Sequence, residues 1–132
     1  MLGLDTNVLV RYLVRDDEAQ FERVLRLFRR ATAADEDLFV SLLVLQETEW
    51  VLRSRYQLSK SEIIATMSAL LETMEIAFED EPAVEETLFL WKDSGADFSD
   101  CLIGVHNRRI GCRATATFDA RAAALNTFVG VA

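Results

Sequence analysis

Two acidic residues that are far apart in the chain each follow a short run of residues that we expect to form a strand. Asp5 directly follows residues 2–4, and Asp119 directly follows residues 113–118. Both runs have the composition of a β-strand. In an open parallel sheet, ligands bind beyond the carboxyl ends of the strands. We therefore expect both acids to lie at one edge of a sheet, although each fits equally well as the cap of the helix behind it.

Glu47 lies in an apolar stripe of the helix expected from Ser41 to about Tyr56. Residues at helical spacing share a face, and those that share the face of Glu47 are Leu43, Val44, Trp50 and Val51. A carboxylate in such a stripe is costly unless it is paired or binds a metal. We expect Glu47 to be buried, with a metal or an arginine beside it, and Glu49 to be a solvated charge on the opposite side.

A further pair of acids opens the helix expected from about Phe98 to a stop before Gly111. Asp97 suits the cap position, and we favour that role for it. Asp100 lies in the first turn, where the helix dipole favours a negative charge. Gly104 is one turn further along the face of Asp100, and a glycine there lets the helix lie close to the sheet. That approach would bring Asp100 inward.

Asp5, Glu47, Asp100 and Asp119 are thus expected to converge on one site. Four close carboxylates cannot all stay ionised without cations. Hard divalent cations such as Mg²⁺ bind carboxylate oxygens and keep several waters. One or two such ions can activate a water and stabilise the leaving oxygen of an in-line displacement. The chemistry implied is phosphodiester hydrolysis with Mg²⁺ or Mn²⁺.

Other polar residues have weaker claims to a role in chemistry. Thr6, Asn7, Thr115 and Thr117 flank the acids and could orient them, although capping and strand propensity explain them at least as well. His106 is the only histidine, and without a nucleophile-elbow motif it fits a partly buried structural role. Cys101 fits a small buried hydrophobe, and we expect both cysteines to be free thiols of a cytoplasmic protein.

The strands are expected at residues 2–4, 38–40, 75–78, 113–118 and 127–131, with helices between them. Strands separated by helices imply parallel pairing, because a parallel connection needs a crossover. We therefore expect one α/β domain over residues 1–132, with a small parallel sheet and helices on both faces. No apolar run approaches the ~20 residues that a membrane span needs.

The charge of the chain bears on its partners. Its 132 residues carry a formal net charge of −8, which by itself argues against nucleic-acid binding and fits concentrated carboxylates or a basic partner. The helix expected after Asp17 bears arginines opposite its apolar face. These are Arg23, Arg26, Arg29 and Arg30. Further arginines could form a local basic rim or be ordinary solvated charges; they are Arg11, Arg15, Arg53, Arg55, Arg108, Arg109 and Arg113.

Four segments resemble motifs of the PIN-domain family, and within it those of the VapC-type toxins of toxin–antitoxin pairs. They are Leu4-Asp5-Thr6-Asn7-Val8-Leu9, the helix around Glu47, Ala96-Asp97-Phe98-Ser99-Asp100-Cys101-Leu102-Ile103 and Thr115-Ala116-Thr117-Phe118-Asp119. By this resemblance Asp5, Glu47 and Asp100 match the first three acids of the family, Asp97 is an extra neighbour, and Asp119 matches a late, more variable acid. The resemblance covers nearly the whole chain.

The resemblance implies a three-layer α/β/α fold and a Mg²⁺- or Mn²⁺-dependent endoribonuclease in the cytoplasm. It also implies a cognate antitoxin protein as inhibitor, and homodimers. Three alternatives stay open: a free-standing RNA-processing nuclease, a catalytically silent interaction module, and a phosphatase with Asp5 as nucleophile. Asn7 counts against the phosphatase, because haloacid-dehalogenase-like enzymes have a second aspartate at that position.

Overall fold

The computed structural model describes all 132 residues and divides them into two compact units. Unit 1 is Met1–Asp80 and unit 2 is Glu81–Ala132. Each unit has its own parallel sheet and its own helices, which confirms the α/β class and the parallel pairing. The single domain over residues 1–132 stays a prediction. None of the helices is long and apolar enough to cross a membrane.

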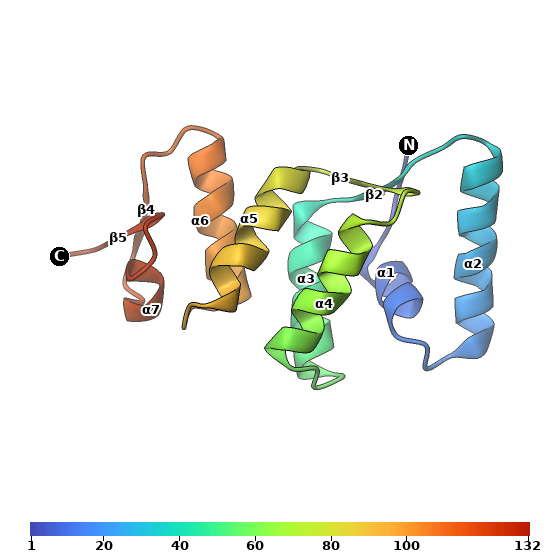
Figure 1. Cartoon of the computed structure of the whole chain (residues 1–132), viewed down its shortest axis with the longest axis horizontal. Coiled ribbons are helices and arrows are strands. Elements are labelled where there is room, and N and C mark those ends of the chain that lie inside the picture. The colour runs from blue at the N-terminus through green and yellow to red at the C-terminus, as the bar shows by residue number, and fades with distance from the viewer. The chain divides into compact units, whose positions relative to one another are not determined.

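Unit 1 begins with a strand and alternates strands with helices (Figure 1). Its elements are β1 (Leu2–Gly3), α1 (Thr6–Leu13), α2 (Glu18–Ala33), β2 (Leu38–Val40), α3 (Leu42–Ser54), α4 (Lys60–Leu71) and β3 (Ile76–Phe78). The strands pair in the order β1-β2-β3, and all are parallel. Leu38 and Val40 of the central strand are fully buried, so β2 runs through the core of the unit.

The helices of unit 1 start at the caps that the sequence predicts. The Asp17 side chain accepts a hydrogen bond from the backbone N–H of Gln20 and begins α2. Ser59 and Glu62, whose Ser-x-x-Glu spacing is the sequence pattern of a capping box, form one at the start of α4. Each such bond satisfies a backbone donor that the helix itself leaves unpaired, which is why these boundaries can be read from sequence.

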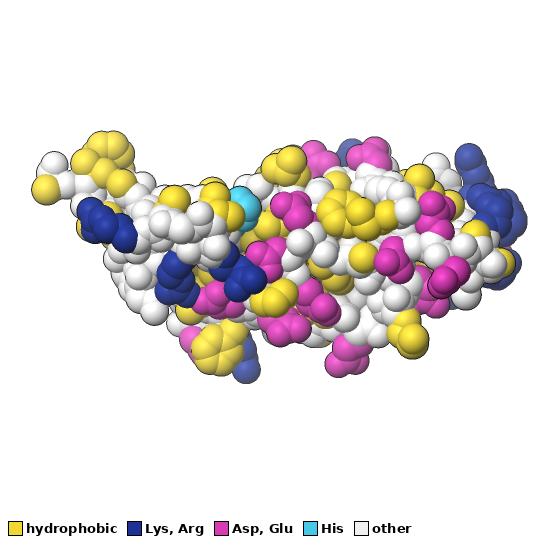
Figure 2. All heavy atoms as spheres, turned by 90° about the horizontal axis from the view of Figure 1, so that it is seen from above, with side chains coloured by type: hydrophobic (Ala, Val, Ile, Leu, Met, Phe, Trp, Pro, Cys, Tyr) yellow, Lys and Arg dark blue, Asp and Glu magenta, His cyan; other side chains and the backbone are white.

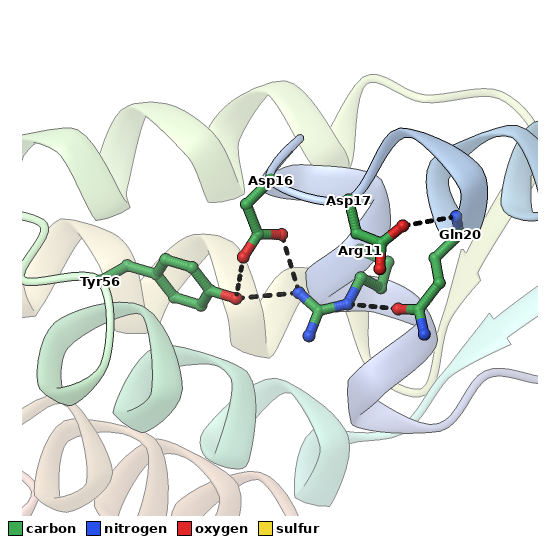
Figure 3. Close-up of polar contacts among 5 residues, drawn as sticks. All are labelled: Arg11, Asp16, Asp17, Gln20 and Tyr56. Carbon is green, nitrogen blue, oxygen red and sulfur yellow. Dashed lines mark hydrogen bonds and ion pairs between the residues drawn. The ribbon is translucent and has the colours of Figure 1, made fainter.

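A polar network around Arg11 joins α1, the start of α2 and the segment after α3 (Figure 3). Arg11 Nη1 donates to Asp16 Oδ1 at 2.9 Å and to the Tyr56 hydroxyl at 2.8 Å. Arg11 Nε donates to Gln20 Oε1 at 2.6 Å. The Tyr56 hydroxyl donates in turn to Asp16 Oδ2. The hydrogen bond with Tyr56 is the main reason that the pKa of Arg11 is raised, so this cation is held in place and stays charged.

Unit 2 combines three helices with a two-stranded parallel sheet. Its elements are α5 (Glu81–Lys92), α6 (Phe98–Arg109), β4 (Thr115–Thr117), α7 (Ala120–Ala123) and β5 (Phe128–Gly130). The rings of Trp91 and Phe98 meet edge-on, with centroids 5.1 Å apart, where α5 packs on α6. Gly111 follows α6 with a φ of +114°, a conformation that favours glycine at a helix end.

Candidate functional site

Asp5 lies at the carboxyl end of β1, where it caps α1. Its Oδ1 accepts a hydrogen bond from the backbone N–H of Thr6 at 2.8 Å, so the capping role is confirmed. The residue is exposed, whereas Thr6 is buried. The cap uses one carboxylate oxygen, and the other has no hydrogen-bond partner. The cap therefore leaves an oxygen free to bind a ligand.

The carboxyl edge of the unit 1 sheet carries further polar side chains. Ser41 follows β2, and its Oγ accepts from the backbone N–H of Val44 at 3.1 Å. Glu79 follows β3, and its Oε1 accepts from the backbone N–H of Leu42 at 3.0 Å. Sequence reasoning placed β3 but missed Glu79, although the rule that singled out Asp5 also applies to it. Glu79 therefore helps to fix the start of α3, the helix that bears Glu47.

Glu47 is exposed on α3, so the prediction that it is buried is wrong. The stripe on which it lies is also open, since Leu43 is 77% and Trp50 is 55% exposed. The buried face of the helix is instead formed by Leu42, Leu45, Thr48, Glu49 and Leu52. The helix is apolar on two faces, and the face that packs into the core is the one that does not contain Glu47.

Glu49 is 1% exposed, so the prediction that it is a solvated charge is wrong. Arg53 Nε lies 2.9 Å from Glu49 Oε2, one helical turn further on. A buried carboxylate needs such a partner, because its desolvation is otherwise uncompensated. The buried acid–arginine pair that was considered for Glu47 thus exists at Glu49. A Glu–Arg spacing of four residues was the available sequence signal.

Three carboxylates interact in unit 2, around the first turn of α6. Asp100 is half-buried. Its burial, and then the charges of Asp119 and Asp97, raise its pKa above the ordinary value. Asp97 occupies the cap position of α6, but its side chain makes no capping hydrogen bond. The role that we favoured for Asp97 is therefore not seen, and its carboxylate adds negative charge beside Asp100.

Asp119 is held by two hydrogen bonds at the carboxyl end of β4. Its Oδ1 accepts from the backbone N–H of Ala122 at 2.9 Å and caps α7. Its own backbone N–H donates to Thr117 Oγ1 at 3.0 Å, so Thr117 contacts the backbone of this residue and not its carboxylate. Thr115 has a different role, because its Oγ1 accepts from Asn107 Nδ2 at 2.9 Å and joins β4 to α6.

Gly104 allows α6 to lie directly against the chain that enters β5. A Cβ added at Gly104 would stand 2.5 Å from both Thr127 Oγ1 and Phe128 Cε2. Contacts that short essentially never occur, so only glycine fits without a shift. The expected close approach is confirmed, and it sets the position of the helix turn that bears Asp100.

The remaining candidate groups have the structural settings that the sequence suggested. His106 is half-buried. Cys101 is buried and Cys112 is exposed, and both are free thiols.

The donor set suits a hard divalent cation. Asp97, Asp100 and Asp119 offer carboxylate oxygens without sulfur or imidazole, and Mg²⁺ and Mn²⁺ prefer such ligands. A cation would also relieve the repulsion that raises the pKa of Asp100. Within either unit, however, no three His, Cys, Asp or Glu side chains are placed so that they could hold a metal ion together. The carboxylates around Asp100 therefore fit a hard cation by their chemistry and not by their placement in this structure.

Comparisons with known proteins agree with the motifs. The family model described as "PIN domain" matches residues 3–127. The chain is also similar to a VapC ribonuclease of Aquifex aeolicus (strain VF5), with 26% identity over 118 residues that cover 89% of this chain and 87% of that protein. The family match confirms the expected three-layer α/β/α, PIN-like fold class, and both matches agree with the resemblance described above.

Proposed function

Because the chain belongs to the PIN-domain family, we propose that it is a metal-dependent endoribonuclease and the toxin of a VapBC-type toxin–antitoxin pair. The observation that carries the proposal is the group of carboxylates around Asp100, whose raised pKa reflects burial next to Asp119 and Asp97. Perturbed acids of this kind are typical of functional sites. The similarity to a VapC ribonuclease over 89% of the chain supports RNA as the substrate.

The proposed catalytic residues and metal ligands are Asp5 and Glu47 of unit 1 and Asp100 and Asp119 of unit 2. Mg²⁺ or Mn²⁺ would supply an activated water and stabilise the leaving oxygen. The chain itself orients the ligands. The backbone N–H of Thr6 fixes Asp5, and Thr117 with the backbone N–H of Ala122 fixes Asp119. Asp100 gains most from a bound cation, because it is half-buried among like charges.

The proposal extends to partners. We propose a cognate antitoxin protein as inhibitor and a homodimer as the working form, as in the VapC-type toxins. We place the activity in the cytoplasm, where RNA is available and where the free thiols of Cys101 and Cys112 would stay reduced.

The proposal is tested by incubating the purified chain with a mixed RNA pool, in Mg²⁺, in Mn²⁺ and in EDTA. Asp5→Asn, Glu47→Gln and Asp100→Asn are the test variants, and Glu72→Gln, at an exposed acid after α4, is the matched control. Asparagine caps a helix about as well as aspartate, so Asp5→Asn removes a charge without removing the cap. We expect metal-dependent cleavage by the wild type and the control, and none by the test variants.

Cleavage that persists in Asp5→Asn protein free of contaminating nuclease would refute the mechanism. Asp119→Asn is expected to be milder, because the family varies at this acid, and a loss as complete as that of Asp5→Asn would refute this ranking. If the wild type cuts no RNA in either metal and binds neither metal, the chain is a silent interaction module. Cleavage without any effect on growth when the chain is expressed would favour a free-standing processing nuclease.

A further inference from the structure

A groove of about 410 Å³ lies between α1 and α2 of unit 1. It is lined by Asn7, Val8, Arg11, Gln20, Arg23, Val24, Arg26, Leu27 and Arg30. Four of these residues are arginines and none is acidic, in a chain whose formal net charge is −8. Figure 2 shows Lys and Arg side chains gathered over α2, at the right of the view. The groove is therefore positively charged, although the chain as a whole is acidic.

The arginines of the groove differ in how far their charge is already compensated. Arg11 is paired with Asp16 (Figure 3). Arg23, Arg26 and Arg30 are exposed, and their side chains make no ion pair or hydrogen bond. Several arginines that could have formed a basic rim are paired with carboxylates, namely Arg15 with Glu18, Arg53 with Glu49 and Arg108 with Glu86. The side chains of Arg23, Arg26 and Arg30 are thus available to an anionic ligand.

The spacing of the three unpaired arginines suits a ligand with repeated negative charges. Positions 23, 26 and 30 share one face of α2. With a helical rise of 1.5 Å per residue, the row extends over about 10 Å, so its guanidinium groups can contact more than one phosphate of a single strand. Guanidinium groups bind phosphate oxygens through paired, directional hydrogen bonds. Val8 and Leu27 add an apolar part that ribose and base can contact.

We infer that this groove binds the phosphate backbone of the single-stranded RNA that the chain cleaves. The inference rests on the proposed nuclease function. Asn7 lines the groove and lies two residues after Asp5 on α1, so the groove includes the helix capped by the first proposed catalytic acid. A row of regularly spaced, unpaired cations fits a ligand with regularly spaced charges, such as RNA, better than a short acidic peptide.

The test is the binding of a fluorescently labelled single-stranded RNA in EDTA, measured by anisotropy between 50 and 200 mM salt. EDTA separates binding from cleavage. The matched pair is Arg26→Gln and Arg29→Gln, which remove the same charge from the same helix. Arg29 lies outside the groove, among Tyr12, Phe28 and Thr32. A triple variant changes Arg23, Arg26 and Arg30 to Gln, and its fold is checked by circular dichroism.

Each lost phosphate contact on a single strand makes the slope of log K against log[salt] about 0.7 less steep. We therefore expect a change of about 0.7 for Arg26→Gln, about 2 for the triple variant and none for Arg29→Gln. At 50 mM salt the triple variant should bind on the order of a hundredfold more weakly. In Mn²⁺ its KM should rise while its kcat at saturating RNA is retained.

Equal effects of Arg26→Gln and Arg29→Gln, or an unchanged slope in the triple variant, would overturn the inference. So would a triple variant that binds RNA normally but no longer binds the cognate antitoxin, because the groove would then be a protein-binding surface. If the wild type cleaves RNA and the triple variant cleaves it with the same KM, the inference about the groove is wrong and the proposed nuclease function is retained. If the wild type neither binds nor cleaves RNA, both the inference about the groove and the proposed nuclease function are wrong.

Discussion

At Gly104, α6 lies so close to Thr127 and Phe128 that adding one methyl group, in Gly104→Ala, tests the structure of unit 2. In Gly104→Ala, the added Cβ would meet Thr127 Oγ1 and Phe128 Cε2 at 2.5 Å, and Thr127 Cβ at 3.0 Å. Thr127 is 1% exposed and is β-branched, so its side chain has little freedom to turn away. The helix must therefore move away from the chain entering β5, and Asp100 must move with it.

The magnitude follows from two opposing effects. Inserting a methyl group into a well-packed core costs about 1–3 kcal/mol, and two contacts at 2.5 Å place this site near the upper end. Alanine in place of glycine in a helix gains about 1 kcal/mol. The net loss is about 2 kcal/mol, which corresponds to a melting temperature lower by roughly 6–10 °C for a chain of this size.

The assay is thermal unfolding in EDTA, followed by circular dichroism. Gly95→Ala is the matched control, because an added Cβ there meets only Arg121 Cδ, at 4.0 Å. The double variant Gly104→Ala/Thr127→Ala removes one of the clashing atoms and should recover part of the loss. Nuclease activity of the folded Gly104→Ala protein should also fall, because the turn bearing Asp100 is displaced. A Gly104→Ala melting temperature equal to that of Gly95→Ala would refute the reasoning.

Three further predictions concern stability. First, Asp100→Asn should raise the melting temperature in EDTA at pH 7, because burial, and then Asp119 and Asp97, raise the pKa of Asp100 from its ordinary 3.8. The cost in stability of ionising Asp100 in the folded protein is absent below pH 3.8, grows as the pH rises towards the raised pKa and is full above it. A gain that did not shrink towards pH 3 would contradict this cause. Second, Arg53→Met should destabilise the fold by about 1–3 kcal/mol in urea unfolding, because it leaves the carboxylate of Glu49 buried without its partner; Glu49→Gln/Arg53→Met should recover part, and no recovery would count against the pair. Third, Thr48→Val should be neutral or stabilising by up to about 1 kcal/mol, since the Thr48 hydroxyl is buried without a hydrogen-bond partner; a clear loss in the same urea assay would mean that this hydroxyl has a partner.

Sequence patterns within a few residues of each other predicted many of the helix and strand boundaries. The strands at residues 38–40 and 115–117 lie within the predicted ranges. The capping box of Ser59 and Glu62 and the glycine after α6 behave as their chemistry dictates. These features depend on backbone donors and on φ angles within a few residues, so sequence alone suffices to predict them.

The burial of α3 could not be predicted in the same way. Leu43 and Trp50 form one stripe at helical spacing, and Leu45 and Leu52 form another. Periodicity alone does not say which of two apolar stripes packs inward, because the choice depends on the sheet and helices that surround the helix. The opposite expectations for Glu47 and Glu49 both failed for this one reason. The roles of Asp5, Glu47, Asp100 and Asp119 in catalysis stay predictions.

The arginines of α2 show a second limit. Their positions opposite the apolar face were visible in the sequence, but their pairing was not. Whether a charged side chain is paired depends on contacts with other elements, as the pairing of Arg11 with Asp16 and Tyr56 shows. The distinction between a compensated and an available cation therefore needs coordinates.

The capping bonds of Asp5 and Asp119 have an evolutionary consequence. Asparagine can replace either residue and keep the hydrogen bond that begins the helix, and one nucleotide change converts an aspartate codon into an asparagine codon. If Asp5 is catalytic as proposed, a gene under selection for inactivation thus has a short path, through Asp5→Asn, to a folded, inert protein. That protein would still present the surfaces of its parent to any inhibitor, and could persist as a decoy.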